Sequence, residues 1–540
     1  MARSHAKGVG RRARGLTRRG FLAGAAVGGA GVWAATSLPR RVLTSDPHRP
    51  PQLYEYFVDS FWFDSVDLYD QAVNAPLRGR QRADVAILGG GYAGMSTAYN
   101  LAQLLPGKRI VLLEGACCGY GASGRNGGFA DAGMPGLETV YEELGPDAAR
   151  RYYDATLLGV RQIRELADEH GVDCDLETNG SISLASEAKH VPRLVTQKAR
   201  YDATLLGMDQ IRSFVDEHGV DCDFEENGAV ALAMEPAQLE ALEAQKSHYD
   251  AMGLEATLLD GPALRRLVAS ERFVGGLRDP RHAILNPAKL ARGMKRVIEG
   301  LGVEVFERSK VLDLEPGASV RILTEFGEVR APIAVVTLNG YAPRLGLFRN
   351  RVIPLCNYVV ATEPLADAQL AAIGWAGREG LADMRVQFMY LRLTADNRIV
   401  FGGESSPYFY GGSPSSGNYR PSLEKLRRSL LVTFPQLEGV RFSHGWGGTM
   451  GFTMDFMPSV GALEGARNLF YAVGFNGEGV VMTQLAGRIL AELIAGEQTA
   501  LTRLPLVSRR MPYVVGEPLR YPILKLYERA LRLLGSNPVR

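Results

Sequence analysis

Three glycines near residue 90 have the spacing of a dinucleotide-binding turn. The stretch AILGGGYAGMS (86–96) places Gly89, Gly91 and Gly94 in the pattern G-x-G-x-x-G. In such a turn the first glycine permits a tight bend, the second lets the backbone approach a pyrophosphate, and the third lets a helix pack closely on the preceding strand. The N–H groups at the start of that helix then face the phosphate oxygens. The pattern predicts a nucleotide site and leaves open whether NAD or FAD occupies it.

An acidic residue stands where the ribose of such a nucleotide would lie. Glu114 ends the apolar segment RIVLLE (109–114), about 20 residues beyond Gly94. At that spacing a carboxylate can accept hydrogen bonds from both ribose hydroxyls. The elements that must position these groups are an apolar strand over 84–88, a helix over 92–105 and the second strand itself. Together they predict a compact β-α-β unit.

A second glycine-rich loop favours FAD. The segment GYGASGRNGG (119–128) combines small residues with the hydrogen-bond donors Ser123, Arg125 and Asn126. Such a loop suits a long ligand that runs past the first helix toward a ring system. A flavoenzyme that also used a pyridine nucleotide would need a second G-x-G-x-x-G fingerprint. We find none elsewhere in the sequence.

The charge of the chain is unevenly distributed. Residues 1–35 hold seven of the 61 Lys and Arg residues and no acidic residue. The other 54 basic residues stand against 59 acidic ones, so the rest of the chain carries a net charge of −5. A mildly acidic body has no general electrostatic footprint for nucleic acid, so we expect no nucleic-acid partner. A length of 540 residues allows roughly two to three domains.

The basic N-terminus leads into an apolar segment typical of an export signal. In LTRRGFLAGAAVGGAGVWAA (16–35) the pair Arg18-Arg19 resembles the twin-arginine signal, which exports proteins already folded around cofactors. A basic tail or an uncleaved anchor are the alternatives, but an apolar core of about 15 residues is short for a membrane span of about 20. We therefore expect residues 1–37 to be a signal peptide. The mature protein would be periplasmic, bound to the cell envelope or extracellular in a bacterium, without a stable membrane span.

Two nearly identical segments follow one another in the middle of the chain. The first begins at Tyr153 and the second at Tyr201, and about 27 of the 48 positions agree. Each copy (153–200 and 201–248) is typical of a helix, a turn at Glu-His-Gly and a short strand. Two copies are too few for a solenoid. We interpret them as a tandem duplication within one domain.

The five cysteines show no metal-ligand spacing, so no metal site is expected. Adjacent Cys117 and Cys118 permit a strained vicinal disulfide, but packing of small residues beside the glycine loop is the favoured interpretation. Cys174 and Cys222 are equivalent positions of the two repeat copies.

Four motifs in order resemble the glycine/D-amino acid oxidase (DAO) family, and most closely its gamma-glutamylputrescine oxidoreductase-like branch. They are ADVAILGGGYAGMSTAYNL, GYGASGRNGG, VVTLNGYAPRL and GFNGEGVVMTQLAGRILAELI, and the similarity spans about residues 50–500. The resemblance implies an α/β (α+β) fold with a Rossmann-like FAD-binding domain interleaved with an antiparallel-sheet substrate domain. It implies removal of hydride from a carbon that bears an amine, to give an imine that water hydrolyses. Oxygen usually reoxidises the flavin and forms hydrogen peroxide.

The resemblance also divides the chain into segments. After the signal, we expect an N-terminal arm (38–82), an FAD-binding domain in three parts (83–150, 276–345, 441–500), a substrate domain in two parts (151–275, 346–440) and a C-terminal tail (501–540).

Cofactor contacts follow from the same resemblance. Gly89, Gly91, Tyr92 and Ala93 would hold the pyrophosphate and Glu114 the adenosine ribose. The segment Ser123, Gly124, Arg125, Asn126 and Gly127 would run along the cofactor toward the isoalloxazine, and Val311 would use its backbone on the adenine.

Gly477, Glu478, Gly479 and Val480 would present N–H groups to the pyrimidine end of the flavin. Reduced flavin is an anion, and the positive end of a helix that starts near Gly479 would stabilise it. Many relatives carry His where this chain has Glu478. An inward carboxylate would oppose the anion, so we expect Glu478 to point outward or to cap the helix.

We expect non-covalent FAD, because the segment GWGGTMGFTMD (445–455) has no Cys and the N-terminal glycine loops have no His. Tyr390 and Arg392 in VQFMYLRLT are the candidate catalytic residues. They stand two positions apart and so share a strand face, from which an Arg could bind a substrate carboxylate through two hydrogen bonds. A solvent-facing strand arginine is the alternative for Arg392. His444 and Trp446 could reach the flavin edge, although a structural role is favoured for His444.

The partners expected are therefore a small-molecule amine or amino acid and either oxygen or an electron carrier. The alternatives to an oxidase are a dehydrogenase that passes electrons to a membrane carrier and a flavin-binding protein without turnover. The sequence leaves the identity of the substrate open.

Overall fold

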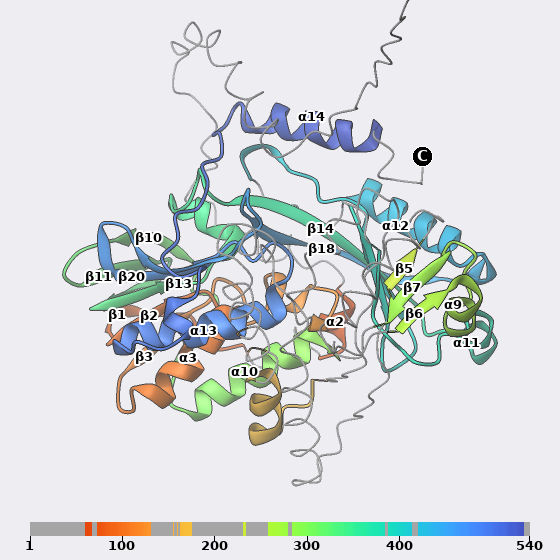
Figure 1. The fold of residues 1–540 in the computed structure, drawn as a ribbon. Helices are drawn as coiled ribbons and strands as arrows, with labels where there is room; N and C mark the ends of the chain where they lie inside the picture. Colours follow the sequence, from red (N-terminus) through yellow and green to blue (C-terminus); the bar gives the residue numbers. More distant parts are fainter. Residues whose placement is uncertain are drawn as a thin grey trace, which may run out of the picture. The chain divides into compact units, whose positions relative to one another are not determined.

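A computed structural model describes most of the second half of the chain and selected parts of the first half (Figure 1). The described residues are 60–66, 73–130, 155, 159, 162–174, 231–233, 257–278, 283–383, 387–412 and 419–533. The predicted signal (1–37) and the first part of the predicted arm (38–59) lie outside them.

A six-stranded sheet forms the centre of the predicted FAD-binding domain. Its strand order is β19-β20-β13-β2-β3-β9, and all neighbours are parallel except the pair β19 and β20. Both faces of β2 and β3 are buried, which explains why their sequences are continuously apolar. The strands are β19 (Ser459–Leu463), β20 (Ala466–Val473), β13 (Ile333–Val336), β2 (Val85–Leu88), β3 (Ile110–Leu113) and β9 (Glu304–Phe306).

Different layers cover the two faces of this sheet. Helices α3 (Tyr92–Leu104), α10 (Pro287–Gly300) and α13 (Gly479–Ala495) pack on one face, where they share a core with the side chains of Val85, Ile87 and Val335. On the other face, Ala86, Leu88 and Val336 pack against a four-stranded sheet. That sheet consists of β1 (Gly79–Arg82), β12 (Gly327–Ala331), β11 (Val320–Thr324) and β10 (Val311–Glu315).

A five-stranded antiparallel sheet forms the second domain. Its order is β15-β16-β17-β14-β18, and its longest pairing joins β14 to β18. The strands are β15 (Leu381–Ala382), β16 (Met389–Leu393), β17 (Ile399–Gly403), β14 (Ile353–Thr362) and β18 (Phe442–Phe452). The predicted combination of a parallel Rossmann-like sheet with a separate antiparallel sheet is confirmed.

Three helices and a small sheet cover one face of the antiparallel sheet. The core on this face includes residues of α9 (Gly261–Leu267), α11 (Asp367–Ile373) and α12 (Arg420–Thr433), together with a small sheet of order β5-β7-β6. The small sheet consists of β5 (Ala231–Ala233), β7 (Gly275–Arg278) and β6 (Thr257–Asp260). The opposite face of the antiparallel sheet packs against the short helix α2 (Phe61–Asp64) and the loop that contains Cys117.

Two segments pack with a different domain from the one predicted for them, and the predicted C-terminal tail packs on the rest of the chain. β18 was assigned to the FAD-binding domain (441–500), but it pairs along its length with β14 of the substrate sheet. Residues 162–174 were assigned to the substrate domain, yet Ile163, Leu166 and Val172 are buried in the FAD-domain core. The predicted C-terminal tail contains α14 (Arg520–Leu533) and is docked, since Val514 N donates to Asn350 O and Tyr408 Oη donates to Glu517.

In the part of the chain that the structure describes, no helix has the length and apolar character that a membrane crossing requires.

The described residues of the repeat come from both copies. In the first copy residues 162–170 are helical, and Cys174 O accepts a hydrogen bond of 2.7 Å from Asn286 N. In the second copy β5 pairs with β7. Apart from 155, 159 and 171–174, the remainder of both copies, including Cys222, lies outside the described residues. One helix of the first copy is therefore part of a core, and one strand of the second copy is part of the small sheet.

We expect that one repeat length can be removed. Deleting residues 175–222, which is 48 residues, joins Cys174 to Asp223 and recreates the natural sequence GVDCD at the junction. The helix of the first copy and β5 of the second are both retained. The shortened protein should fold, bind FAD and melt within about 4 °C of the full chain, the shift of about 1 kcal/mol in a large domain. Thermal denaturation followed by flavin fluorescence measures this. An insoluble or flavin-free product would contradict it.

Candidate functional site

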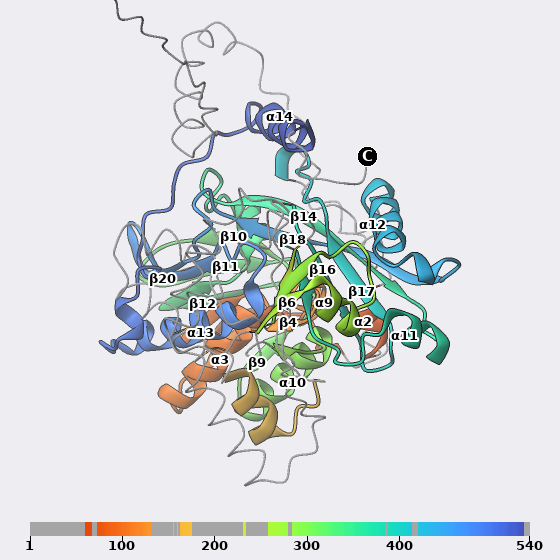
Figure 2. The same ribbon diagram turned by 45° about the vertical axis from the view of Figure 1, so that its right-hand side comes forward.

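Four segments meet at the carboxyl edge of the parallel sheet. Leu88 is level with both Leu113 and Val336, and Val336 is level with Tyr471 near the end of β20. The residues that follow β2, β3, β13 and β20 therefore reach the same edge, where open parallel sheets bind their ligands. Helices α3 and α13 both begin here and lie side by side (Figures 1 and 2). Two positive helix ends thus point to one region.

The glycine turn between β2 and α3 has no space for side chains. Gly89 has a φ of +111°. A Cβ atom on Gly94 would lie 1.9 Å from Gly89 O, and one on Gly91 would lie 3.0 Å from Ser123 Oγ. The residue that precedes α3, Gly91, has no side chain that could cap the helix. A helix start in a bare backbone cradle fits a pyrophosphate, as the spacing predicted.

Gly90, which the sequence pattern did not single out, is equally constrained. Its N–H donates to Glu114 Oε2 at 2.7 Å, and a Cβ here would lie 2.8 Å from Cys118 Sγ. The signal for this residue is the unbroken run of glycines from 89 to 91.

Glu114 lies beside the glycine turn. Besides the bond from Gly90, its Oε1 accepts a hydrogen bond of 2.8 Å from Ala116 N. Burial raises the pKa of this carboxyl group to about 7, although the N–H donors oppose the shift and the neighbouring Glu307 adds to it. A half-buried carboxylate at the sheet edge is suited to accept ribose hydroxyls, whose hydrogen bonds would favour its charged form.

A buried ion pair between Glu307 and Lys295 lies next to this edge. Glu307 accepts hydrogen bonds from Lys295 Nζ at 2.8 Å, from Cys118 N at 2.7 Å and from Asn74 N at 2.7 Å. Burial alone would raise the pKa of Glu307, but these hydrogen bonds hold it below its usual value. Glu307 thereby joins the loop after β3 to residue 74 of the N-terminal arm.

Cys117 and Cys118 are buried free thiols. Burial raises the pKa of Cys117 to about 12. The packing interpretation of this pair is confirmed, and no vicinal disulfide forms.

The loop 119–128 continues from the glycine turn toward the antiparallel sheet. Ser123 Oγ accepts a hydrogen bond of 2.9 Å from Tyr92 N, so this loop is joined to the first turn of α3. A Cβ on Gly124 would lie 2.5 Å from Gly119 O.

The side chains of Arg125 and Asn126 are used within the protein. Arg125 donates to Tyr120 O at 2.9 Å and to Gly447 O at 3.0 Å, and its guanidinium lies over the Tyr120 ring. Asn126 Nδ2 donates to Ser123 O at 2.9 Å. These two side chains therefore shape the loop.

The remaining predicted cofactor residues lie near the same edge. Val311 begins β10, two residues after Ser309, whose N–H donates to Glu114 O at 2.7 Å. Gly477 has a φ of +96° and directly precedes the start of α13. Glu478 is exposed and its side chain does not cap the helix, whereas Gly479 begins α13 and Val480 is buried. Of the two orientations expected for Glu478, the capping one is not seen.

Arg392 does not occupy the predicted position of a carboxylate clamp. Its side chain is 1% exposed, and its Nη1 donates to Leu285 O at 2.8 Å and to Gly128 O at 3.1 Å. Its Nε donates to Leu393 O. A guanidinium held by three backbone carbonyls in the protein interior is not presented to a substrate. The sequence could not reveal this, because two of the three acceptors come from distant segments.

Tyr390 lies on the face of the sheet that meets the loop. Its ring occupies the space above two glycines, since a Cβ on Gly127 or on Gly402 would lie 2.6 or 2.3 Å from it. Its hydroxyl is 3.5 Å from Asn357 Oδ1, and burial raises its pKa. Tyr390 therefore stays a candidate for substrate contact, and Asn357 joins it.

His444 and Trp446 have structural contacts. His444 Nε2 lies 2.8 Å from Asp64 Oδ2, and Trp446 Nε1 donates to Arg125 O at 2.9 Å. The structural role favoured for His444 agrees with this geometry.

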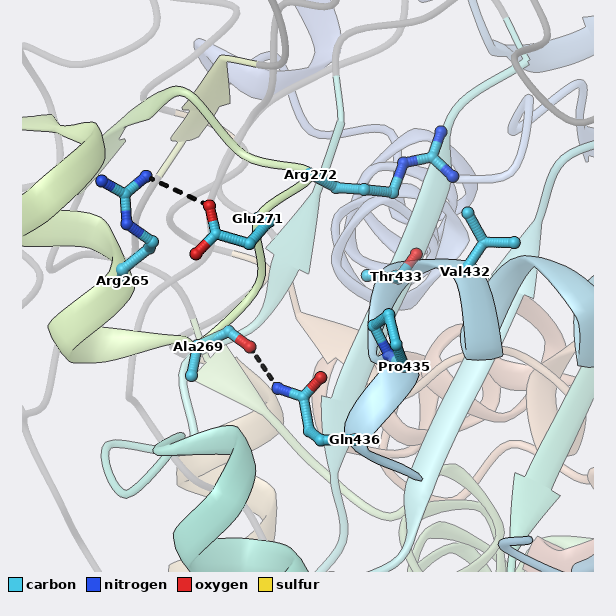
Figure 3. Close-up of a pocket in the computed structure, with 8 residues that line it drawn as sticks. All are labelled: Arg265, Ala269, Glu271, Arg272, Val432, Thr433, Pro435 and Gln436. Atoms are coloured by element: carbon cyan, nitrogen blue, oxygen red, sulfur yellow. Dashed lines mark hydrogen bonds and ion pairs between the residues drawn. The ribbon is translucent and has the colours of Figure 1, made fainter. Parts of the chain in front are cut away.

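A pocket of about 500 Å³ lies elsewhere, on the helical side of the antiparallel sheet. It is lined by the end of α12 and by residues after α9, and none of its lining residues belongs to the glycine turn. Figure 3 shows Arg265 paired with Glu271 and Gln436 bonded to Ala269 O.

Glu114 should give the FAD-free protein a measurable pH dependence. Its folded-state pKa of about 7 lies above the ordinary value of 4.5, so the folded state binds the proton more tightly. Its contribution to the free energy of unfolding is therefore largest below pH 4.5 and is lost as the pH rises through about 7. Replacement by Gln should remove this part of the slope.

The measurement is urea denaturation of FAD-free wild-type and E114Q protein between pH 5 and 8. We expect the difference between their free energies of unfolding to change across this range. Parallel curves would show that the carboxyl group titrates alike in both states.

Comparisons with known proteins identify the family and support the fold. The family model "DAO: FAD dependent oxidoreductase" matches residues 84–213 and 195–493. The chain is 32% identical to gamma-glutamylputrescine oxidoreductase of Escherichia coli over 448 residues, covering 81% of this chain and 89% of that protein. It is 28% identical to the probable oxidoreductase OrdL of Haemophilus influenzae over 457 residues, covering 83% and 91% of the two chains.

Among solved structures, glycine oxidase from Geobacillus kaustophilus has the same fold. It superposes with a TM-score of 0.59 at 19% identity, covering 80% of this chain and 100% of that one. The family match extends over the glycine turn, Glu114, the loop 119–128 and the start of α13. The chain therefore belongs to the DAO family of FAD-dependent oxidoreductases, to which the resemblance of its four motifs had pointed.

Proposed function

We propose that the protein oxidises the C–N bond of an amine to an imine and passes the electrons to oxygen, which forms hydrogen peroxide. Its relatives are FAD-dependent oxidoreductases that act on amines or amino acids. FAD supplies the two-electron acceptor for a hydride from the substrate carbon, and water then hydrolyses the released imine. The observation that carries the proposal is the carboxyl edge, where the glycine turn, Glu114 and the start of α13 meet below the antiparallel sheet.

The position of each residue suggests its role in the proposed reaction. The backbone at Gly89–Gly91 and the start of α3 would hold the pyrophosphate, and Glu114 the ribose. The start of α13 at Gly479 would place its positive end near the negative charge of the reduced cofactor. Tyr390 and Asn357 would orient the substrate from the antiparallel sheet and exclude water.

The environment of Arg392 favours an amine over an α-amino acid. This residue was the candidate for binding a substrate carboxylate, and its guanidinium is instead held by backbone carbonyls. On this face of the antiparallel sheet, the described residues also include Arg125, which donates to Gly447 O, and Arg398, whose guanidinium lies over the Phe61 ring. A carboxylate placed there would lose its hydration and would compete with these existing contacts for a cationic partner.

Matched pairs of compounds test both parts of the proposal. Ornithine is putrescine with an added α-carboxylate, and lysine is cadaverine with the same addition. Under anaerobic conditions we expect the diamine of each pair to bleach the flavin absorbance at least about tenfold faster, because an unpaired carboxylate is costly to bury. With oxygen present, peroxide should form at the rate at which oxygen is consumed.

Each contrary outcome has a distinct meaning. Faster bleaching by the amino acids, of either enantiomer, would show that the carboxylate is bound. Bleaching without oxygen consumption would identify a dehydrogenase that needs another electron carrier. A flavin that no amine, polyamine or amino acid reduces would identify a flavin-binding protein without turnover.

We further propose that the protein is exported in folded form with FAD bound non-covalently. The support is the twin-arginine segment and the absence of Cys from 445–455. In a producing bacterium, the protein outside the cytoplasm should lack about residues 1–37, and acid precipitation should release its flavin. Flavin that stays with the precipitated polypeptide would overturn non-covalent binding. Full-length protein confined to the cytoplasm would overturn export.

A further inference from the structure

Three side chains from distant parts of the chain donate hydrogen bonds to the loop 119–128. Trp446 Nε1 donates to Arg125 O at 2.9 Å, and Trp62 Nε1 donates to Asn126 O at 2.8 Å. Arg392 Nη1 donates to Gly128 O at 3.1 Å. We call Trp62, Trp446 and Arg392 the carbonyl clamp. They come from α2, β18 and β16, so three elements converge on four consecutive residues.

The carbonyl clamp is buried and its members touch one another. Trp62, Trp446 and Arg392 are 1%, 0% and 1% exposed. The two indole rings pack edge to face at 6.5 Å, and the Arg392 guanidinium lies 5.5 Å from the centre of the Trp62 ring. A carbonyl in so buried a place has few alternative partners, so these hydrogen bonds constrain the loop, and Gly128 O also accepts from Leu285 N at 2.8 Å.

Trp62 is itself held from several sides. Ser65 Oγ donates to Trp62 O at 2.8 Å and accepts from Asn286 Nδ2 at 3.0 Å. Asp64 pairs with His444. Phe63 stacks on Tyr120 and fills the place where Gly124 would otherwise carry a side chain, 2.6 Å from a Cβ built there. The short helix α2 thus packs directly against the loop.

Both ends of the loop contact residues of the cofactor site, so the position of the loop affects that site. Toward the phosphate end, Ser123 accepts a hydrogen bond from Tyr92 at the start of α3. Toward the substrate end, Gly127 lies directly beneath the ring of Tyr390. A displacement of the carbonyls at 125–128 therefore moves both the helix start that faces the pyrophosphate and the residue proposed to face the substrate.

We propose that Trp62, Trp446 and Arg392 are positioning residues, which set the path of the loop 119–128 by holding three of its carbonyls and thereby orient bound FAD. The N-terminal segment supplies one of the three donors. The sequence suggested Arg392 as a substrate ligand, but we assign it a positioning role, which it exerts through its hydrogen bond to Gly128 O.

The experiment replaces single indoles by phenylalanine. W62F and W446F each retain an aromatic ring and remove one N–H donor to the loop. W375F is the matched control, because Trp375 is also buried and donates its Nε1 to Glu379 O at 3.2 Å, but in the core of the antiparallel sheet away from the loop. All three variants lose one indole hydrogen bond to a backbone carbonyl.

Two measurements on the FAD-loaded proteins read the position of the loop. In W62F and W446F, amide hydrogen exchange of the peptide that covers residues 119–130 should be at least about fivefold faster than in the wild type. The visible circular dichroism of the flavin should change as well. In W375F the melting temperature should fall while both loop readouts stay at the wild-type values.

Unchanged loop exchange and an unchanged flavin spectrum in W62F and W446F would overturn the proposal and leave both tryptophans as packing residues. If one of these variants does not fold, the other decides, because each indole holds its own carbonyl. Neither measurement needs turnover or a dissociable cofactor. A protein that oxidises no amine, or that holds its flavin covalently, therefore still gives a result.

Discussion

The close approach of α3 to the end of β2 is the constraint on which the site depends. No side chain fits at Gly94, because its Cβ would lie 1.9 Å from Gly89 O. This contact brings the start of the helix to the sheet edge and leaves Gly90 within hydrogen-bond distance of Glu114. A methyl group on Gly94 would displace the helix from the strand end, whereas one on Gly90 would collide with Cys118 and Glu114.

The second domain depends on the same edge through the loop 119–128. One end of the loop is bound to the start of α3, and its other end lies under the antiparallel sheet. Neither domain alone would enclose a flavin. The parallel sheet would contact it only at its carboxyl edge, and the antiparallel sheet would only cover it with one face. The buried cluster around Trp62, Phe63 and Trp446 joins the two surfaces. The orientation of the two domains is thus maintained by apolar packing between elements far apart in the sequence.

The sequence predicted those parts of the site that depend on local spacing. The glycine turn, Glu114 and the start of α13 follow from the order of strand, turn and helix, because parallel strands end at one edge. The contacts of Arg392 could not be predicted in this way, since its acceptors at residues 128 and 285 are distant from it in the sequence. β18 was placed in the other domain for the same reason, because its pairing with β14 is not encoded in its own alternation. Trp62 carries no motif, and only tertiary structure reveals its contact with Asn126.

The position of α2 also constrains how the chain can fold during synthesis. Trp62 and Asp64 leave the ribosome early, but the partner of Asp64 is 380 residues further along the chain. Likewise, β1 cannot form its pairing until β12 has been synthesised, because Gly79 lies opposite Gly327. Contacts of such long range slow folding, because a long loop must close before any energy is gained. The cluster around Phe61, Trp62 and Phe63 is therefore incomplete until β18 has been synthesised, and during that interval its exposed aromatic side chains are a natural binding site for a chaperone.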